Sequence, residues 1–424
     1  MNVERALNVL PDVEGFLPLR ALLLSSASAD RVLPEAGGSY RTVGKHEVSA
    51  DELQARLPAA LDQITTHFTV LSEAYVHALV CIERGTPAEA IDDLIRGGAT
   101  EECGGRISQA REWYSVALRV ARELRDRRPE SAATFALARL SMRIGNTEEA
   151  ARCCRRSLEL AEANGDTRAE VDACEGLGDI GVLRGLRPDG VLWYTRALAH
   201  ARKLNDESRV GLLRLSLATL WRADGSLDPA VEEIRHAVAC FEELGDLENL
   251  VRTLCVRAEI ERDLGRSAQS VATYREALAW SYRAQDGRGM EIRVHVGIAR
   301  LYLHSGRPLD AEAEIRRAEQ LATSEGRLGW LAQIYTFLGT LSGLREDHDG
   351  FVFFEQALAF SRMLQGSPVF EARICVEYGE YRNRMKQRAE AITVLGRAYA
   401  LFTLVGAAGE AALTEVQLRV MGGA

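Results

Sequence analysis

Side chains that could perform catalysis are scattered along the sequence and form no recognisable motif. None of the eight histidines has another three or four residues away, as two metal ligands on one helix would. The stretch from Gly38 to His46 imitates a phosphate-binding loop. It has one residue too many between its glycines, however, and lacks the Ser or Thr that would bind magnesium. We therefore expect no catalytic residue, no metal and no cofactor, and keep an enzyme only as a minor alternative.

Composition and charge narrow the class of partner. The chain has 424 residues, a formal charge of -9 and 47% hydrophobic residues, so it can bury a large core and lacks the basic surface that nucleic acids or anionic membranes require. Its eight cysteines include no C-x-x-C pair, which is typical of a reduced compartment. Glu4 and Pro11 interrupt the start where a secretory signal would be basic and then apolar. We expect a cytoplasmic protein that binds neither nucleic acid nor membrane.

An internal repeat of about 40 residues dominates the chain. Its first marker is a glycine that returns at 40-residue intervals and then once at 41, at Gly105, Gly145, Gly185, Gly225, Gly265 and Gly306. Two further units follow without the glycine. Because such a period fits two helices and two turns, we call the helix before the glycine turn helix A and the one after it helix B. The last stretch, from Glu410 to Met421, is predicted to form a capping helix.

Each helix B carries a small, a large and a small residue on one face. The inner small positions are Ala110, Ala150, Gly190, Ala230, Ser270, Ala311, Gly350 and Ala391, and the outer ones are Ala117, Ser157, Ala197, Ala237, Ala277, Ala318, Ala357 and Ala398. Between them lie Tyr114, Cys154, Tyr194, Ile234, Tyr274, Ile315, Phe354 and Leu395. A third small set, on helix A, is Ala138, Gly178, Ala218, Ala258, Ala299, Gly339 and Gly379. This pattern predicts a large side chain set between close helix contacts.

Aspartates recur where each next helix A should begin, at Asp126, Asp166, Asp206, Asp246 and Asp286. A helix start needs a side-chain acceptor for its free N–H groups, and aspartate supplies one. We predict that these residues cap the helices.

The repeat resembles the tetratricopeptide family in its 40-residue form, as in kinesin light chains, LGN-type adaptors and bacterial regulators. The stretch from Leu177 to Ile180, Gly185, Gly190, Tyr194 and the Ala197–Leu198 pair carry the resemblance best. It implies an all-α, right-handed solenoid of about eight helix-turn-helix repeats over residues 87 to 421, with a small helical N-terminal region. It also implies a concave groove for a partner, lined by helix A.

The resemblance places one residue of each helix A in the groove, six positions before the turn. These residues are Arg139, Asp179, Thr219, Glu259, Arg300, Thr340 and Glu380. Two neighbouring positions add Arg222, Arg262, Arg252 and Arg293, so five arginines gather in three consecutive repeats. Either they pair with acids of the protein, such as Glu259 and Asp263, or they bind a carboxylate-bearing peptide. The sequence leaves both interpretations open.

The favoured function is therefore a scaffold or adaptor that binds a protein or peptide of unidentified nature in the groove. The alternative is a peptide-sensing regulator, since a helical module before seven or eight such repeats resembles the Rap-type regulators. In that case the ligand would reposition residues 1–86.

Residues 1–86 lie outside the repeat, and we predict a loose linker near residues 34–50 and a helix over residues 57–83. Apolar residues in this helix alternate steps of four and three, as in a coiled-coil seam. The helix is expected either to lie on the first repeat or in a small local bundle with residues 2–25, or to present an association surface. That surface would dock an effector module or form a homodimer through Leu61, Ile64, Phe68, Leu71 and Tyr75.

Substitution Phe68→Glu distinguishes the two roles of this helix. If the seam holds two chains together, the variant should become monomeric while the repeats keep their thermal stability, because a buried charge opposes association. Light scattering and circular dichroism measure the two properties. Unfolding of the first repeats would instead mark the helix as a cap, and a monomeric parent chain would exclude the seam.

Overall fold

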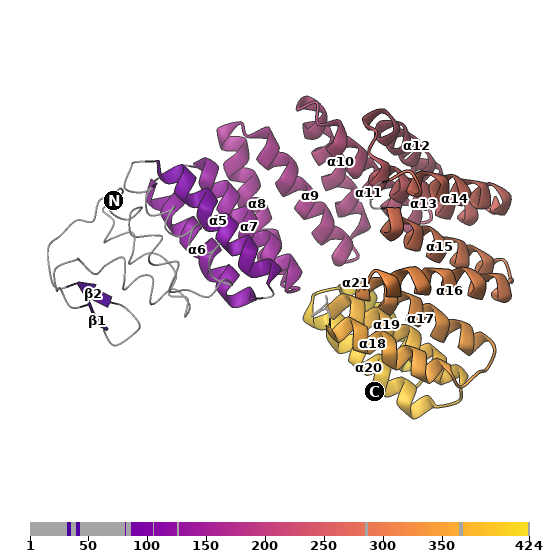
Figure 1. Ribbon diagram of the computed structural model, residues 1–424. Helices are drawn as coiled ribbons and strands as arrows, with labels where there is room; N and C mark the ends of the chain where they lie inside the picture. Colours follow the sequence, from indigo (N-terminus) through magenta and orange to yellow (C-terminus); the bar gives the residue numbers. More distant parts are fainter. Residues whose placement is uncertain are drawn as a thin grey trace. The chain divides into compact units, whose positions relative to one another are not determined.

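The computed structural model describes residues 32–34, 40–42, 81, 86–104, 106–124, 127–284, 287–363 and 368–422. Seventeen helices, α5 to α21, follow one another from Pro87 to Val420 (Figure 1). The A helices are α5 (Pro87–Cys103), α7 (Arg127–Arg143), α9 (Thr167–Leu183), α11 (Glu207–Ala223), α13 (Leu247–Asp263), α15 (Gly287–His304), α17 (Leu328–Leu344), α19 (Pro368–Arg384) and α21 (Ala408–Val420). The B helices are α6 (Ile107–Leu124), α8 (Thr147–Asn164), α10 (Arg187–Lys203), α12 (Leu227–Leu244), α14 (Ser267–Ser281), α16 (Pro308–Ser324), α18 (Gly350–Met363) and α20 (Arg388–Leu404).

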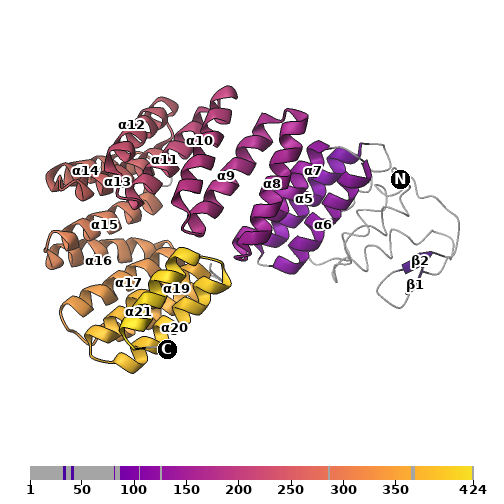
Figure 2. The same ribbon diagram turned by 180° about the vertical axis from the view of Figure 1, so that it is seen from behind.

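The helices pack in consecutive helix-turn-helix pairs, so the predicted all-α repeat fold is confirmed. Helix A packs most extensively on the helix B that follows it in the pairs α5–α6, α11–α12, α13–α14, α15–α16, α17–α18 and α19–α20. Figures 1 and 2 show α17 to α21 side by side in this manner. In the described residues from Pro87 onward there is no strand.

The turns and caps have the local chemistry that the sequence predicted. Gly185, Gly225, Gly265 and Gly306 all have a positive φ, which glycine adopts without steric cost. The last two units have Glu346 and Lys386 at this place, and both residues take the same strained conformation, at φ 56 and 62°. Asp166, Asp206 and Asp246 accept hydrogen bonds from backbone N–H groups three residues on. Asp126 and Asp286 lie outside the described residues.

The core is built from the predicted large and small positions. Both small sets and the large set of helix B are buried, with Ala237, Ala277 and Ala318 fully so. Where the small residue of helix A is a glycine, the large side chain of the following helix B packs directly on it, as Tyr194 does on Gly178 and Phe354 on Gly339. A Cβ added at either glycine would come within 2.6 Å of the ring. The helices therefore approach as closely as a missing side chain allows.

The chain divides into two compact units, residues 1–142 with 149–173, and residues 143–148 with 174–424. Unit 1 contains the hairpins formed by α5 with α6 and by α7 with α8. Unit 2 contains every repeat from α10 onward and ends in α21, which packs on α20. Ala411 and Thr414 of α21 are buried, whereas Leu413, Val416 and Val420 are mostly exposed.

Little of the N-terminal region is described. Strands β1 (Val32–Pro34) and β2 (Tyr40–Thr42) pair antiparallel. β1 ends where the predicted loose linker, residues 34–50, begins, and β2 lies within that linker. The helix over residues 57–83, with its possible dimer seam, lies outside the described residues apart from Cys81, so it stays a prediction. Among the described helices, none has the length and apolar character needed to cross a bilayer.

Substitution Ala277→Leu tests the close packing on α14. A larger side chain at this fully buried position should push the helices apart and lower the free energy of unfolding by about 1 to 3 kcal/mol. Ala279→Leu is the matched control, since Ala279 is exposed on the same helix and leucine and alanine have similar helix propensities. Equal urea midpoints for the two variants would contradict this description of the core.

Candidate ligand-binding groove

Two adjoining cavities lie along the A helices of unit 2. The larger has a volume of about 750 Å³ and is walled by α15, α17, α19 and α21, with Phe402 of α20 at its base. The smaller, of about 390 Å³, is walled by α9, α11, α13, α15 and α17, with Tyr194 of α10. Both include Arg300 and Gln333, so they form one surface that we call the groove.

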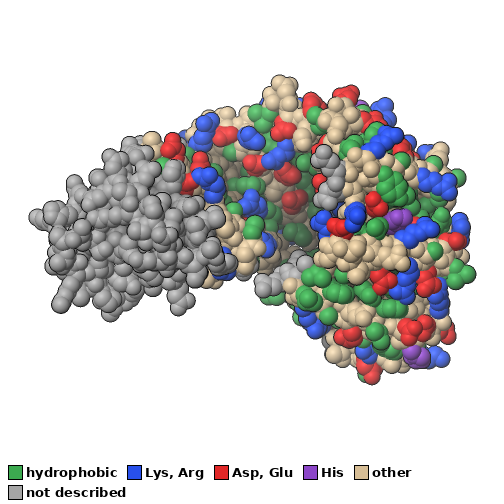
Figure 3. Space-filling model, in the orientation of Figure 1, with side chains coloured by type: hydrophobic (Ala, Val, Ile, Leu, Met, Phe, Trp, Pro, Cys, Tyr) green, Lys and Arg blue, Asp and Glu red, His purple; other side chains and the backbone are tan. Residues whose placement is uncertain are grey.

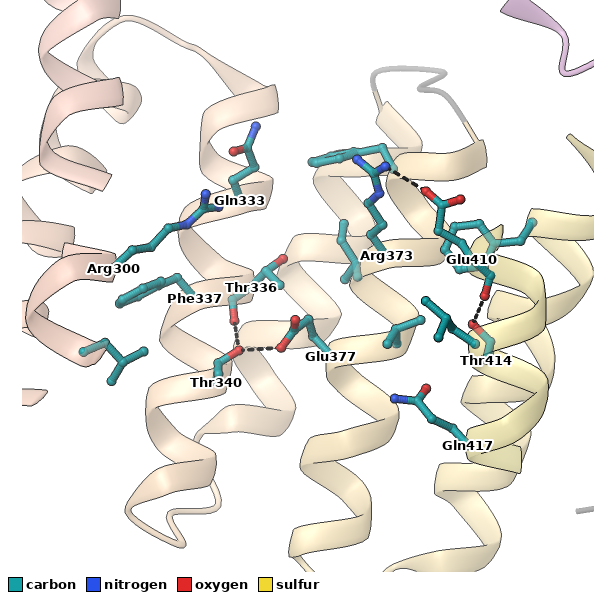
Figure 4. Close-up of a pocket in the computed structure, with 16 residues that line it drawn as sticks. Arg300, Gln333, Thr336, Phe337, Thr340, Arg373, Glu377, Glu410, Thr414 and Gln417 are labelled. Carbon is teal, nitrogen blue, oxygen red and sulfur yellow. Dashed lines mark hydrogen bonds and ion pairs between the residues drawn. The ribbon is translucent and has the colours of Figure 1, made fainter. Parts of the chain in front are cut away.

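The larger cavity combines an apolar wall with polar side chains. Its wall is lined by Leu303, Phe337, Phe370, Ile374, Phe402 and Leu413. Thr340 donates a hydrogen bond to Glu377, with Oγ1 and Oε2 at 3.4 Å, and Arg373 forms an ion pair with Glu410 at 3.0 Å. Figure 4 shows both pairs, with Arg300 and Gln333 on the opposite side from α21. Polar groups that already have partners therefore surround an open apolar surface.

The smaller cavity has unneutralised positive charge. Arg252 of α13 and Arg293 and Arg300 of α15 line it. All three are exposed, and within the described residues none of them forms an ion pair. Arg293 instead lies over the ring of Trp330, 5.1 Å from its centroid, a favourable contact between a cation and an aromatic face. Although it is exposed overall, Arg252 loses part of its hydration against the groove wall, and this effect, followed by the charge of Arg293, lowers its pKa.

The other two arginines of the predicted cluster are paired within the protein. Arg222 forms ion pairs with Glu259 at 2.8 Å and with Asp263 at 3.3 Å, and Arg262 pairs with Asp263 at 2.7 Å. Both arginine side chains are about one-fifth exposed. The two interpretations left open by the sequence thus apply to different residues. The paired arginines fit the structural one, and Arg252, Arg293 and Arg300 fit the ligand-binding one.

A regular offset between neighbouring A helices explains the difference. Side chains that meet across two A helices lie 37 residues apart, as in Arg222 with Glu259, Thr340 with Glu377, Arg373 with Glu410 and Glu380 with Gln417. Equivalent positions on α13 and α15 are 41 rather than 40 residues apart, so the matching position for Arg252 is 38 residues on, at Met290; for Arg293 and Arg300 it is Trp330 and Phe337. None is acidic. These three arginines are therefore left without an acid at the position that neutralises the others.

The remaining predicted groove residues have varied surroundings. Thr219 and Glu259 line the smaller cavity and Thr340 the larger one. Asp179 accepts a hydrogen bond from Tyr194 at 2.5 Å. Glu380 accepts one from Gln417 at 2.9 Å, next to the larger cavity. Arg139, in unit 1, lies 3.7 Å from Glu102.

Several groove residues were missed by the sequence prediction. Trp330, Gln333, Phe337 and Phe370 line the two cavities but were not predicted. A register of 37 residues, applied to each arginine of helix A, would have found Trp330 and Phe337. The period of 40 identifies equivalent positions and does not show which side chains touch.

Candidate chemistry in the groove is limited. Cys255 lines the smaller cavity, and burial raises its pKa to about 12, so its thiol is protonated at neutral pH and is a poor nucleophile. Within the described residues, no group of His, Cys, Asp or Glu side chains is arranged to hold a metal ion. On the face shown in Figure 3, acidic and basic side chains are interspersed over the described helices.

Replacing Arg222 or Arg252 by glutamine tests whether the first is a structural residue and the second is not. Arg222→Gln should lower the free energy of unfolding by about 1 to 2 kcal/mol, because it leaves Glu259 without its ion pair in a half-buried site. Arg252→Gln should leave stability unchanged or raise it by up to about 0.5 kcal/mol, because it removes the repulsion from Arg293 and breaks no ion pair, losing only the weaker attraction to Glu248. Urea unfolding of both variants measures the contrast. Equal losses would show that Arg252 is also a structural residue.

Comparisons with known proteins agree with the repeat architecture. Residues 133–164, which cover most of α7 and α8, match the family model described as Tetratricopeptide repeat. No curated protein sequence matches the chain.

Two solved structures share the fold at 10% identity. The apo form of RapI matches with a TM-score of 0.54, covering 74% of this chain and 97% of its own. Aspartyl phosphate phosphatase F from Bacillus subtilis matches with a TM-score of 0.53, covering 87% and 97%. Likeness at this identity concerns the fold alone. One repeat, residues 133–164, matches the tetratricopeptide family model, and the same helix pair recurs from α5 to α20, so the chain has the repeat fold of tetratricopeptide proteins.

Proposed function

We propose that this chain is a non-enzymatic interaction protein whose groove binds a peptide or an extended segment of a partner protein. The observation that carries the proposal is the pair of adjoining cavities along the A helices. They present apolar surface beside three arginines that lack an internal ion pair. Apolar surface is costly to leave in water, and neighbouring positive charges repel one another, so a ligand that covers the first and neutralises the second gains free energy.

The size and polarity of the groove suit a peptide. Cavities of roughly 300 to 1,000 Å³ hold small ligands or a few side chains, and the larger one here, at about 750 Å³, is in that range. Gln333, Thr336 and Gln417 line its wall and offer side-chain groups to the backbone of an extended ligand. A peptide brings apolar side chains and backbone polar groups together, as these walls require.

A second candidate function is that of a peptide-sensing regulator. The supporting observation is the uneven packing of the A helices, since α13 packs directly on α15 and α17 on α19, whereas α15 and α17 touch less. Arg300 and Gln333, which both cavities share, lie on these two helices. A ligand that bridges them would draw α15 and α17 together and change the spacing of the repeats. Small-angle scattering with and without a bound peptide distinguishes a sensor, which compacts, from a passive scaffold.

Catalysis has less support. The acids of the two cavities already have partners, with Glu259 held by Arg222, Glu377 by Thr340 and Glu410 by Arg373. The phosphatase activity from which aspartyl phosphate phosphatase F takes its name is a property of that protein. We propose no cofactor for this chain and no nucleic acid or membrane as its partner, because its charge of -9 opposes both.

Substitution Gln333→Trp tests groove binding. Gln333 lines both cavities, so a tryptophan there should block their junction and remove the partners that the parent chain captures from its native cell extract. Quantitative mass spectrometry of the captured proteins measures the loss.

Gln320→Trp is the matched control, because Gln320 is exposed on the neighbouring helix B, α16, and lines neither cavity. Circular dichroism checks that both variants are folded. Partners that bind the Gln333→Trp and Gln320→Trp variants equally would show that binding occurs elsewhere on the chain.

A further inference from the structure

The uneven distribution of charge along the groove identifies the chemistry of its ligand. The arginines without an ion pair line the smaller cavity, and only Arg300 extends to the larger one. In the larger cavity, the other arginine, Arg373, is paired with Glu410. One end of the groove is therefore cationic and the other apolar. Resting on the proposed function, we propose that the ligand is a peptide with two anchors, a carboxylate held by Arg252 and Arg293 and an apolar side chain held in the larger cavity.

The cationic end is suited to a carboxylate. A guanidinium offers parallel N–H donors that match the two oxygens of a carboxylate. Arg293 is held by its contact with Trp330, so less rotamer entropy is lost when it binds. The register positions of Arg252 and Arg293 are occupied by Met290 and Trp330, neither of which is acidic. Glu248, one turn before Arg252, attracts its charge but forms no ion pair with it in the described residues. Both guanidinium groups line the cavity, where a ligand could supply the carboxylate.

A phosphate is the other anion that the arginines could bind. Glu259 lines the same cavity as the arginines, and Glu377 lines the adjoining one. A group with a charge near -2 would be attracted more strongly by the arginines and repelled more strongly by these acids than a singly charged carboxylate. The proposal commits to the carboxylate, and the experiment below tests the phosphorylated peptide against it.

The apolar end supplies the second anchor. Leu303, Phe337 and Ile374 form a wall on which a phenylalanine or leucine side chain would lose most of its contact with water. Burying such a side chain contributes roughly 1.5 to 3 kcal/mol. Leu413 lines this cavity and is 70% exposed, so it can be replaced without opening the core.

The helix spacing sets the distance between the anchors. Arg252 and Arg293 lie on α13 and α15, and the apolar wall lies mainly on α17 and α19, about two helix positions further along. At roughly 8–10 Å for each helix step, the anchors are about 16–20 Å apart. An extended peptide spans this distance with about five residues at roughly 3.3 Å each.

A positional scan with synthetic peptides tests the proposal. The probes are fluorescein-labelled, C-terminally amidated decapeptides in a Gly/Ser background, each with one Glu and one Phe separated by one to seven residues, in both orders. Fluorescence anisotropy with the full chain should show tightest binding near a separation of five residues, in one order only. Replacing Glu by Gln, or Phe by Ser, should weaken that binding about tenfold, which corresponds to about 1.4 kcal/mol.

Variants of the protein locate each anchor. Arg252→Gln and Arg293→Gln should each weaken the best peptide about tenfold and should have little further effect on its Gln-for-Glu version, because the two changes remove the same contact. The protein variant Leu413→Ser should weaken binding of the best peptide but have little further effect on the peptide in which Phe is replaced by Ser, because both changes remove the apolar contact. Arg235→Gln is the control, since Arg235 is exposed on the B helix α12 and pairs only with Glu232. It should bind all peptides as the parent does.

Each alternative outcome overturns a defined statement. Binding that depends on Phe and is independent of Glu, or Arg252→Gln and Arg293→Gln variants that bind like the Arg235→Gln variant, would remove the carboxylate anchor and leave groove binding intact. Tighter binding of a phosphoserine probe than of the Glu probe would overturn the choice of carboxylate. Failure of every probe would end the two-anchor proposal, whereas the capture experiment with Gln333→Trp decides the proposed function separately.

Discussion

The contact that the rest of the fold depends on is the close approach of helices A and B within a repeat. A large side chain of helix B lies directly on a glycine or alanine of helix A, as Tyr194 lies on Gly178 and Leu395 on Gly379. This contact fixes the distance and the rotation of the two helices together, because the ring can lie only where a side chain is missing. The large position of helix B is buried in each unit from Tyr114 to Leu395, so each A helix turns an equivalent face away from its partner, and in unit 2 these faces line the groove.

The same contact sets the electrostatics of that face. Once the A helices have a constant rotation, a side chain on one meets the side chain 37 residues later on the next, and the sequence decides case by case whether a charge is met by an opposite one. Arg222 and Arg373 each meet a glutamate. Arg293 meets the ring of Trp330, and Arg252 and Arg300 have Met290 and Phe337 at the matching position. These three positive charges therefore gather in one cavity without an acid at the place where Arg222 and Arg373 have one.

Most of the fold could be predicted from the sequence, because its determinants are local and periodic. The turn glycines, the caps at Asp166, Asp206 and Asp246, and the small residues of both helices each act within one repeat.

The site was predicted only in part. Equivalent positions showed that arginines gather, but the period of 40 gives no offset between neighbouring helices, so it could not show that Arg222 is paired and Arg252 is not. The positive φ of Lys386 was also unforeseen, because the neighbouring helices impose this conformation where glycine is missing.

A repeat scaffold with such regular contacts has few independent ways to move, and this constrains how its groove can respond. Within a hairpin, the interlocked large and small residues resist sliding, whereas adjacent A helices are joined mainly by side-chain pairs at the 37-residue register. Where that register brings an ion pair, as between α11 and α13, neighbouring repeats are tied together. Between α15 and α17 the register brings Arg293 onto the ring of Trp330 and Arg300 to Phe337, so among the described residues no ion pair joins these two helices, and they touch less than α13 and α15 do. The two cavities meet at this junction. A ligand bound across it would replace the missing link, so binding and stiffening of the solenoid would occur as one event.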